Sequence, residues 1–209
     1  MSERNPPCWL EWAREIQALA QTGVHYAEND YQRQRYQRLL EIAAEIISAH
    51  STLPLDALQE SFNAQIGYAT PRVDVRGAVF RDGKLLMVRE RADGGWTLPG
   101  GWADVGDVPS EAVEREVWEE AGFQVEARRI IGVYDANRVG PLEVFHAYKI
   151  VFLCDLLLGE ARPSQEILDV NFFSQEEVPQ TLSGERTLPR HIRDVFLAVQ
   201  NDHWITVFD

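Results

Sequence analysis

The chain has 209 residues, of which 45% are hydrophobic and 25% charged, and its formal net charge is −13. This composition excludes a disordered chain and fits one large domain, or a medium domain with a small one. The negative charge argues against broad binding to nucleic-acid backbones, and no apolar run reaches the roughly 18 residues that a membrane span needs.

The first segment, residues 1–66, has the pattern of a small helical domain. Apolar residues recur at helical spacing in WLEWAREIQALA, and we expect Gly23 to end this helix. Asp30 is placed to cap a second helix, and a short third helix is expected around 55–62. Large aromatic side chains lie along these helices, where we expect them in a core or in a subunit interface: Trp9, Trp12, Tyr26, Tyr31 and Tyr36.

From about residue 70 the hydrophobic period becomes strand-like. VDVRGAVFRDGKLLMVRE predicts two strands joined by a turn at 81–83, and WTLPGGW predicts a strand that ends in a Gly-Gly turn. A helix is expected over 109–121, then strands in FQVEARRIIGVYD, FHAYKIVFLCDLLL and ILDVNFFS, and a last helix around 188–200. This order predicts an α+β domain over 67–209, an α/β/α sandwich with a mixed sheet.

The two cysteines, Cys8 and Cys154, lie far apart and have no metal-binding spacing. We expect no disulfide framework, and Cys154, within the apolar run IVFLCDLLL, is expected in the core. The N-terminus lacks the basic and apolar regions of a secretory signal. The sequence therefore favours a reducing, cytoplasmic setting.

The stretch LPGGWADVGDVPSEAVEREVWEEAGF, residues 98–123, concentrates acidic side chains. Seven carboxylates fall within it: Asp104, Asp107, Glu111, Glu114, Glu116, Glu119 and Glu120. Glu116, Glu119 and Glu120 share one face of the expected helix, because positions three and four apart are neighbours. Either solvent or a hard divalent cation must offset their repulsion. The Gly-Gly turn favours the cation, since glycine lets the backbone approach a ligand closely.

This stretch resembles the signature of the Nudix hydrolases. The signature is Gly, five residues, Glu, seven residues, Arg-Glu, an aliphatic residue, any residue, Glu-Glu, any residue, Gly and an apolar residue. From Gly101 to Phe123 every fixed position matches except one, where Asp107 replaces the first Glu. The N-terminal helices, FHAYKIVFLCDL and the closing TVFD are also similar to a bacterial Nudix subgroup. Its members hydrolyse nucleoside diphosphates linked to another moiety, including ADP-ribose and CDP-choline.

The resemblance implies roles for individual residues. By similarity, Glu116 and Glu120 are metal ligands, Glu119 shares the metals or activates water, and the Gly101 carbonyl is a backbone ligand. Arg115 orients the glutamates. The implied cofactor is Mg²⁺, with Mn²⁺ as an alternative, and the implied reaction is attack of water on one phosphorus of a diphosphate.

Several roles stay open. The general base is either Glu119 or Glu166, and Glu166 can equally be an exposed loop acid. Trp102 either stacks on a base or ribose or packs within the fold. Arg138 is placed to contact a phosphate. His146 either faces the diphosphate from a strand, together with the nearby Lys149, or is an ordinary strand histidine.

The remaining carboxylates divide into two pairs. Asp107 is one methylene shorter than Glu, and we expect it to brace the loop rather than touch a metal. Asp104 either supplies a further oxygen or caps the loop. Glu111 and Glu114 are expected in solvent near the helix start, where the helix dipole favours acids.

The resemblance therefore implies a cytoplasmic, Mg²⁺-dependent pyrophosphatase for a nucleoside diphosphate linked to a group X. ADP-ribose is the first substrate and CDP-choline or another CDP-alcohol the second. A nucleotide-sensing regulator would need a degraded signature or a basic segment, and an RNA-processing hydrolase would need a basic groove. The N-terminal helices are expected to cover the site or to form a homodimer.

Overall fold

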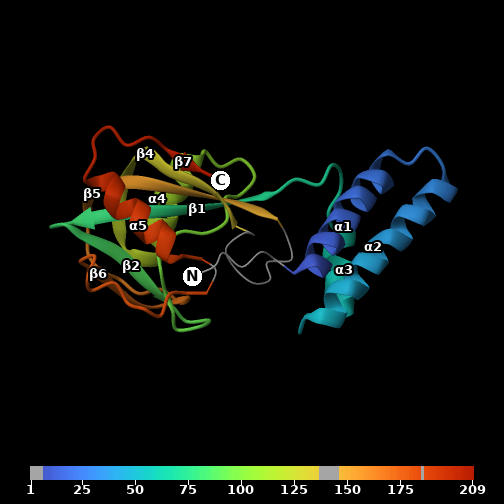
Figure 1. Ribbon diagram of the computed structural model, residues 1–209, viewed down its shortest axis with the longest axis horizontal. Helices are drawn as coiled ribbons and strands as arrows, with labels where there is room; N and C mark the ends of the chain where they lie inside the picture. The colour runs from blue at the N-terminus through green and yellow to red at the C-terminus, as the bar shows by residue number, and fades with distance from the viewer. Residues whose placement is uncertain (1–6, 137–145, 185) are drawn as a thin grey trace. The chain divides into compact units, whose positions relative to one another are not determined.

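The computed structural model describes residues 7–136, 146–184 and 186–209 (Figure 1). The chain divides into two compact units, a helical unit within residues 7–71 and a sheet-containing unit that begins at residue 72. Each unit has its own hydrophobic core. None of the described helices is long and apolar enough to cross a lipid bilayer.

Three helices form the helical unit: α1 (Cys8–Tyr26), α2 (Asp30–His50) and α3 (Leu55–Asn63). The prediction that Gly23 ends the first helix is wrong, since α1 continues to Tyr26. An added Cβ at Gly23 would lie 2.3 Å from the Cδ1 atom of Tyr36. Glycine inside α1 therefore lets α2 pack closely, which offsets its low helix propensity.

The start of α2 and the core of the helical unit also differ in detail from expectation. Asn29 caps α2 in place of Asp30, because its side chain accepts a hydrogen bond from the Gln32 N–H at 2.9 Å. Of the apolar stripe predicted for α1, Trp12 and Leu19 are exposed, whereas Ala20 lies in the core and Trp9 and Ile16 pack against it. The core of the unit consists of Leu10, Ala13, Ala20, Leu40, Ala43, Ala44, Ile47, Leu58 and Phe62.

The second unit contains a mixed sheet with two helices. Its strands are β1 (Arg72–Arg81), β2 (Lys84–Glu90), β3 (Trp96–Thr97), β4 (Phe123–Asp135), β5 (Ala147–Gly159), β6 (Ile167–Phe173) and β7 (Val207–Phe208). Its helices are α4 (Pro109–Ala121) and α5 (Pro189–Val199). The strand order is β3-β2-β1-β5-β4-β7, and β6 pairs with β2. Strands β1 and β5 run parallel, whereas β4 and β5 run antiparallel.

The two helices cover opposite faces of this sheet (Figure 1). Residues of α4 pack with Val75 and Val79 of β1, whereas residues of α5 pack with Ala78, which points to the other face. Gly77 lies under α4, and an added Cβ there would stand 2.6 Å from a methyl carbon of Val117. The predicted α/β/α sandwich with a mixed sheet is confirmed.

The turns follow the predicted chemistry, and the third strand is shorter than predicted. Asp82 and Gly83 both have positive φ, 53° and 75°, as a tight hairpin turn between β1 and β2 requires. Gly122 ends α4 in the left-handed conformation. Only Trp96 and Thr97 of WTLPGGW form a strand, because the following segment turns to pair with β1.

Candidate active site

The Gly-Gly turn is attached to β1 by backbone hydrogen bonds. The Gly77 N–H donates to the Pro99 carbonyl and the Val75 N–H to the Gly101 carbonyl, both at 2.8 Å. Gly100 has a φ of 144°, and an added Cβ would lie 2.0 Å from the Val75 carbonyl oxygen. Only glycine fits at this position, because both the backbone conformation and the space exclude a side chain.

The turn receives two glutamates from α4. The Gly100 N–H donates to the Glu120 Oε2 atom at 2.8 Å. Glu116 lies against Gly101, where an added Cβ would stand 2.7 Å from its Oε2 atom. Burial raises the pKa of Glu120 to about 7, although the buried Arg76 guanidinium and the Gly100 N–H act in the opposite direction. Burial also raises the pKa of Glu116, against the influence of Arg115.

Arg115 joins the glutamates to the loop. Its Nη1 atom lies 2.8 Å from the Glu116 Oε1 atom and 3.5 Å from the Glu119 Oε2 atom, and its Nη2 atom lies 2.9 Å from the Asp107 Oδ2 atom. Asp107 also accepts a hydrogen bond from the Asp104 N–H at 3.0 Å. These two donors, the backbone N–H first, lower the pKa of Asp107. Asp107, although shorter than Glu, therefore holds the Arg115 guanidinium in place against the loop.

The other carboxylates of the stretch are less buried than Glu116 and Glu120 or serve elsewhere. Glu111 and Asp104 are exposed, and the side chain of Glu119 is 56% exposed. The prediction that Glu114 lies in solvent is wrong. Its Oε1 atom accepts a hydrogen bond from the Ala127 N–H at 2.8 Å, at the point where the pairing of β4 with β5 shifts register. Glu114 therefore stabilises a strand irregularity.

A buried ionic group lies next to the turn, and sequence reasoning missed most of it. Asp74 forms ion pairs with Arg76, at 2.8 Å, and with Lys149 of β5, and all three are buried. Of the two alternatives left open for this strand, the burial of Lys149 and its pairing with Asp74 disfavour the one in which Lys149 faces a diphosphate. A signal existed in VDVRGAV, where charges alternate with apolar residues. That pattern is typical of a sheet with one solvent-exposed face. Here helices cover both faces, so the charged side chains of β1 are buried and must form ion pairs with one another or with neighbouring strands.

Glu90, at the end of β2, is a second buried acid that the sequence did not indicate. Its Oε1 atom lies 3.4 Å from the Arg186 Nε atom, and burial raises its pKa. The charge of Glu90 contributes to the raised pKa of Glu120, so the two carboxylates are electrostatic neighbours. Glu166, exposed in the loop before β6, acts on Glu90 in the same sense.

The residues predicted to contact the substrate do not form a group like that of the glutamates and Arg115. Trp102 is 43% exposed, and the Arg72 guanidinium carbon lies 5.9 Å from its ring centroid. His146 is exposed, immediately precedes β5, and groups with the helical unit, so the prediction that it is a strand residue is wrong. Arg138 lies outside the described residues.

The donor atoms at the turn fit a hard divalent cation. Within the described ranges no three acidic, histidine or cysteine side chains form a preformed metal cage. Glu116 and Glu120 nevertheless supply carboxylate oxygens, and the Gly101 carbonyl has a second lone pair besides that bonded to Val75. The raised pKa values of both glutamates show that burial penalises their charges. A cation bound here would offset that penalty.

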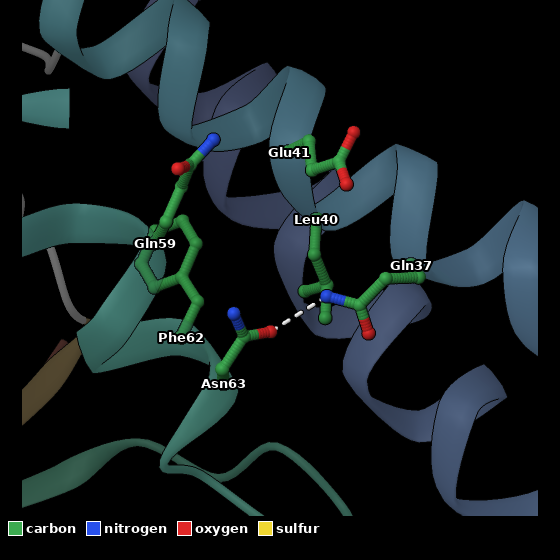
Figure 2. Close-up of a pocket in the computed structure, with 6 residues that line it drawn as sticks. All are labelled: Gln37, Leu40, Glu41, Gln59, Phe62 and Asn63. Carbon is green, nitrogen blue, oxygen red and sulfur yellow. Dashed lines mark hydrogen bonds between the residues drawn. The ribbon is translucent and has the colours of Figure 1, made fainter. Parts of the chain in front are cut away.

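A hollow in the helical unit carries no comparable chemistry (Figure 2). Its volume is about 90 Å³, and its lining residues are Gln37, Leu40, Glu41, Gln59, Phe62 and Asn63. The Gln37 Nε2 atom donates to the Asn63 Oδ1 atom at 2.6 Å, and Glu41 forms an ion pair with Arg38. The pKa-perturbed carboxylates named above therefore make the glycine turn the stronger candidate for an active site.

Matches to known proteins cover nearly the whole chain. Residues 7–62 match a family described as a UDP-X-like, N-terminal oligomerisation domain, and residues 70–195 match the NUDIX domain. YjhB of Bacillus subtilis strain 168, provisionally named an ADP-ribose pyrophosphatase, is 35% identical over 202 residues, which are 96% of this chain and 97% of that protein.

Two crystal structures are similar to this chain. A UDP-X diphosphatase is 30% identical with a TM-score of 0.62, over 96% of this chain and 98% of that chain. An ADP-ribose pyrophosphatase from Streptococcus suis 89-1591 is 38% identical with a TM-score of 0.60, over 67% of this chain and 100% of that chain. The chain therefore belongs to the NUDIX family and is a hydrolase of pyrophosphate bonds.

Proposed function

We propose that the protein is a Mg²⁺-dependent pyrophosphatase that splits ADP-ribose into AMP and ribose 5-phosphate. The observation that carries this proposal is the pair of partly buried glutamates, Glu116 and Glu120, placed against the Gly100–Gly101 backbone. The names of YjhB and of the Streptococcus suis structure support ADP-ribose as the substrate.

In this proposal Glu116, Glu120 and the Gly101 carbonyl hold the metal, and Glu119 shares it or activates water. Bound Mg²⁺ would polarise the phosphoryl oxygens and stabilise negative charge in the transition state. Arg115 keeps Glu116 and Glu119 in place through its bond to Asp107. Mn²⁺ is expected to substitute for Mg²⁺, since both take oxygen ligands.

The base and the substrate contacts stay proposals. Glu119 and Glu166 are the two candidates for the general base. Trp102, Arg138 and His146 are the proposed substrate contacts. The exposed face of the Trp102 ring supports a stacking role.

A UDP-linked compound is the second candidate substrate. The match of residues 7–62 to a UDP-X-like domain and the similarity to a UDP-X diphosphatase over 96% of this chain favour it. CDP-choline is the third. A panel of ADP-ribose, a UDP-sugar and CDP-choline with Mg²⁺, with the products identified, tests the proposal. Preferred turnover of ADP-ribose into AMP supports the proposal. Preferred turnover of the UDP-sugar or of CDP-choline would contradict ADP-ribose as the substrate and assign that compound instead.

We infer that the helical unit joins two copies of the chain. Trp12, Leu19 and Tyr26 of α1 are 62%, 64% and 65% exposed and lie seven residues apart, so they form one apolar stripe on the helix. Exposed apolar stripes of this kind are typical of protein interfaces. The matched oligomerisation domain covers this helix.

The free state of Cys8 and Cys154 supports the proposed cytoplasmic setting.

A further inference from the structure

The buried ionic group of the sheet-containing unit is unusual in its composition. One carboxylate, Asp74, is paired with two cations, Arg76 and Lys149. Asp74 and Lys149 are register partners on the parallel strands β1 and β5. Burying three charges costs solvation free energy, and a buried ion pair is weak evidence for a purely stabilising role. The position of the group suggests another role.

Arg76 reaches from this group to the glycine turn. Its Nε atom donates to the Asp74 Oδ1 atom at 2.8 Å, and its Nη1 atom donates to the Leu98 carbonyl at 3.2 Å. Arg76 also lies directly against Gly100, since an added Cβ there would stand 2.8 Å from the Arg76 Cα atom and 3.0 Å from its Cδ atom. One guanidinium therefore connects a fixed carboxylate in the sheet to the start of the turn.

The same turn holds the candidate metal ligands. The Gly100 N–H donates to Glu120, and the backbone of Gly101 lies against Glu116. A shift of the backbone after Leu98 would move both contacts together. Arg76 thus supports the carboxylates indirectly, through the backbone of the turn.

We propose that Arg76, held by Asp74, is a positioning residue that fixes the glycine turn so that Glu116, Glu120 and the Gly101 carbonyl can bind a divalent cation. This inference rests on the proposed function of the site. A competing role is that of a simple counter-charge. At a pH well above 7, where Glu120 is ionised, the two roles predict opposite effects on metal binding, because a nearby cation repels a metal ion, whereas a fixed turn helps to bind it. Metal binding is therefore compared in this pH range.

The test measures Mn²⁺ binding by electron paramagnetic resonance in the full-length wild type, Arg76→Met and Arg76→Lys. For Arg76→Met we expect the Mn²⁺ affinity to fall about tenfold, the usual effect of removing a group that orients metal ligands. Arg76→Lys keeps the charge but has a single donor atom, which cannot join Asp74 to Leu98 as the guanidinium fork does. We therefore expect weakened Mn²⁺ binding in this variant too.

A counter-charge role would show the reverse pattern, with tighter Mn²⁺ binding in Arg76→Met and wild-type binding in Arg76→Lys. Either result overturns the inference. Tyr134→Phe is the matched control, because it removes a buried hydrogen bond to Asp194, 3.1 Å long, elsewhere in the same unit. We expect it to lower the melting temperature without changing Mn²⁺ affinity. An equal change in Tyr134→Phe and Arg76→Met would also overturn the inference.

Turnover separates this inference from the proposed substrate. With Mg²⁺ and the best substrate of the panel, Arg76→Met should lower kcat and raise the Mg²⁺ concentration needed for half activity, with little change in the KM for the nucleotide. Wild type that binds Mn²⁺ but hydrolyses no compound of the panel contradicts the proposed function alone. Unchanged Mn²⁺ binding and kcat in Arg76→Met contradict the role of Arg76 alone.

Discussion

The two units of the chain differ in the arrangement of their exposed apolar side chains and in the charge of their buried ones. The helical unit has an apolar core and leaves large apolar side chains, such as Trp12 and Leu19, exposed. The sheet-containing unit covers both faces of its sheet and buries charged side chains, such as Asp74, Arg76 and Glu90. A stripe of exposed apolar side chains along one helix is typical of an interface, whereas single exposed ones such as Leu158 are ordinary surface residues. Buried charged groups with shifted pKa values are typical of a functional site. The comparison supports the proposal that one unit associates with a second copy while the other carries the hydrolytic site.

The largest effect is expected for Glu120→Gln, which tests whether the sheet-containing unit carries the hydrolytic site. We expect kcat to fall about a thousandfold, because a metal ligand worth several kcal/mol in the transition state is lost, while the protein stays folded. Turnover of ADP-ribose and circular dichroism measure the two effects. Glu111→Gln is the matched control, an exposed glutamate of the same helix, and should keep wild-type activity. Full activity in Glu120→Gln would remove Glu120 from the site.

The second prediction concerns the helical unit. Trp12→Ala together with Leu19→Ser should weaken self-association about a hundredfold or more, since central aromatic anchors dominate interface free energies. Light scattering after size-exclusion chromatography over a concentration series measures this. The exposed Leu158 of β5, changed to Ser, is the control in the other unit. Activity per chain separates the two expected roles, because it stays unchanged if the helices only associate and falls if they also cover the site.

The third prediction is a pH dependence of stability in the metal-free protein. The pKa of Glu120 is raised to about 7 in the folded state, so this carboxyl group holds its proton more strongly in the folded protein than in the unfolded chain between about pH 4.5 and 7. The contribution of Glu120 to the free energy of unfolding should therefore decrease through this range as pH rises, by on the order of 2 kcal/mol. This contribution is taken as the difference between wild type and Glu120→Gln, because burial lowers the pKa of His191 and the stability contributed by His191 changes in the opposite direction. Urea unfolding with EDTA at pH 5 and pH 7.5 measures it.

Two controls belong with this measurement. Glu120→Gln should reduce the pH dependence, since the titrating group is gone. Added Mg²⁺ should stabilise the protein most at the higher pH, where the ligands are ionised. An equal pH dependence of stability in metal-free wild type and Glu120→Gln would contradict the raised pKa of Glu120.

The smallest effects are expected at Asp107, the position that departs from the family signature. Asp107→Ala should lower kcat about tenfold, because Arg115 loses its loop partner and no longer holds Glu116 firmly. Asp107→Glu, which restores the signature, should stay close to wild type. A steady-state assay with Mg²⁺ titration distinguishes the two variants. A large defect in Asp107→Glu would show that the loop is built for the shorter side chain.

Much of the local structure was predictable, because local rules decide it. The helix Pro109–Ala121 and the strand Phe123–Asp135 have the predicted limits, since Pro, Gly and the apolar period act over short distances. The end of α1 was not predictable, because Gly23 is tolerated there only through its contact with Tyr36 of another helix. Glu114 was misplaced for a similar reason, since its partner is the backbone of a strand that follows the helix.

The candidate site divides in the same way. The sequence alone contains the Gly-Gly turn and the spacing of Glu116, Glu119 and Glu120. It also contains the resemblance to the Nudix hydrolases. Which carboxylates are buried, and which cations accompany them, depends on the other strands. Lys149 lies 75 positions from Asp74, yet the parallel pairing of β1 with β5 makes them an ion pair.

By itself, then, the sequence determined the signature, the helix that carries its glutamates and the order of the elements, because these depend on neighbours within one turn or one strand. The tertiary structure alone decided that Asp74, Arg76 and Lys149 are buried together, that Arg76 reaches Leu98, and that the pKa of Glu120 rises. The sandwich itself was expected from the order of the elements, but the partners of each buried charge come from strands far apart in the sequence, and no local pattern names them.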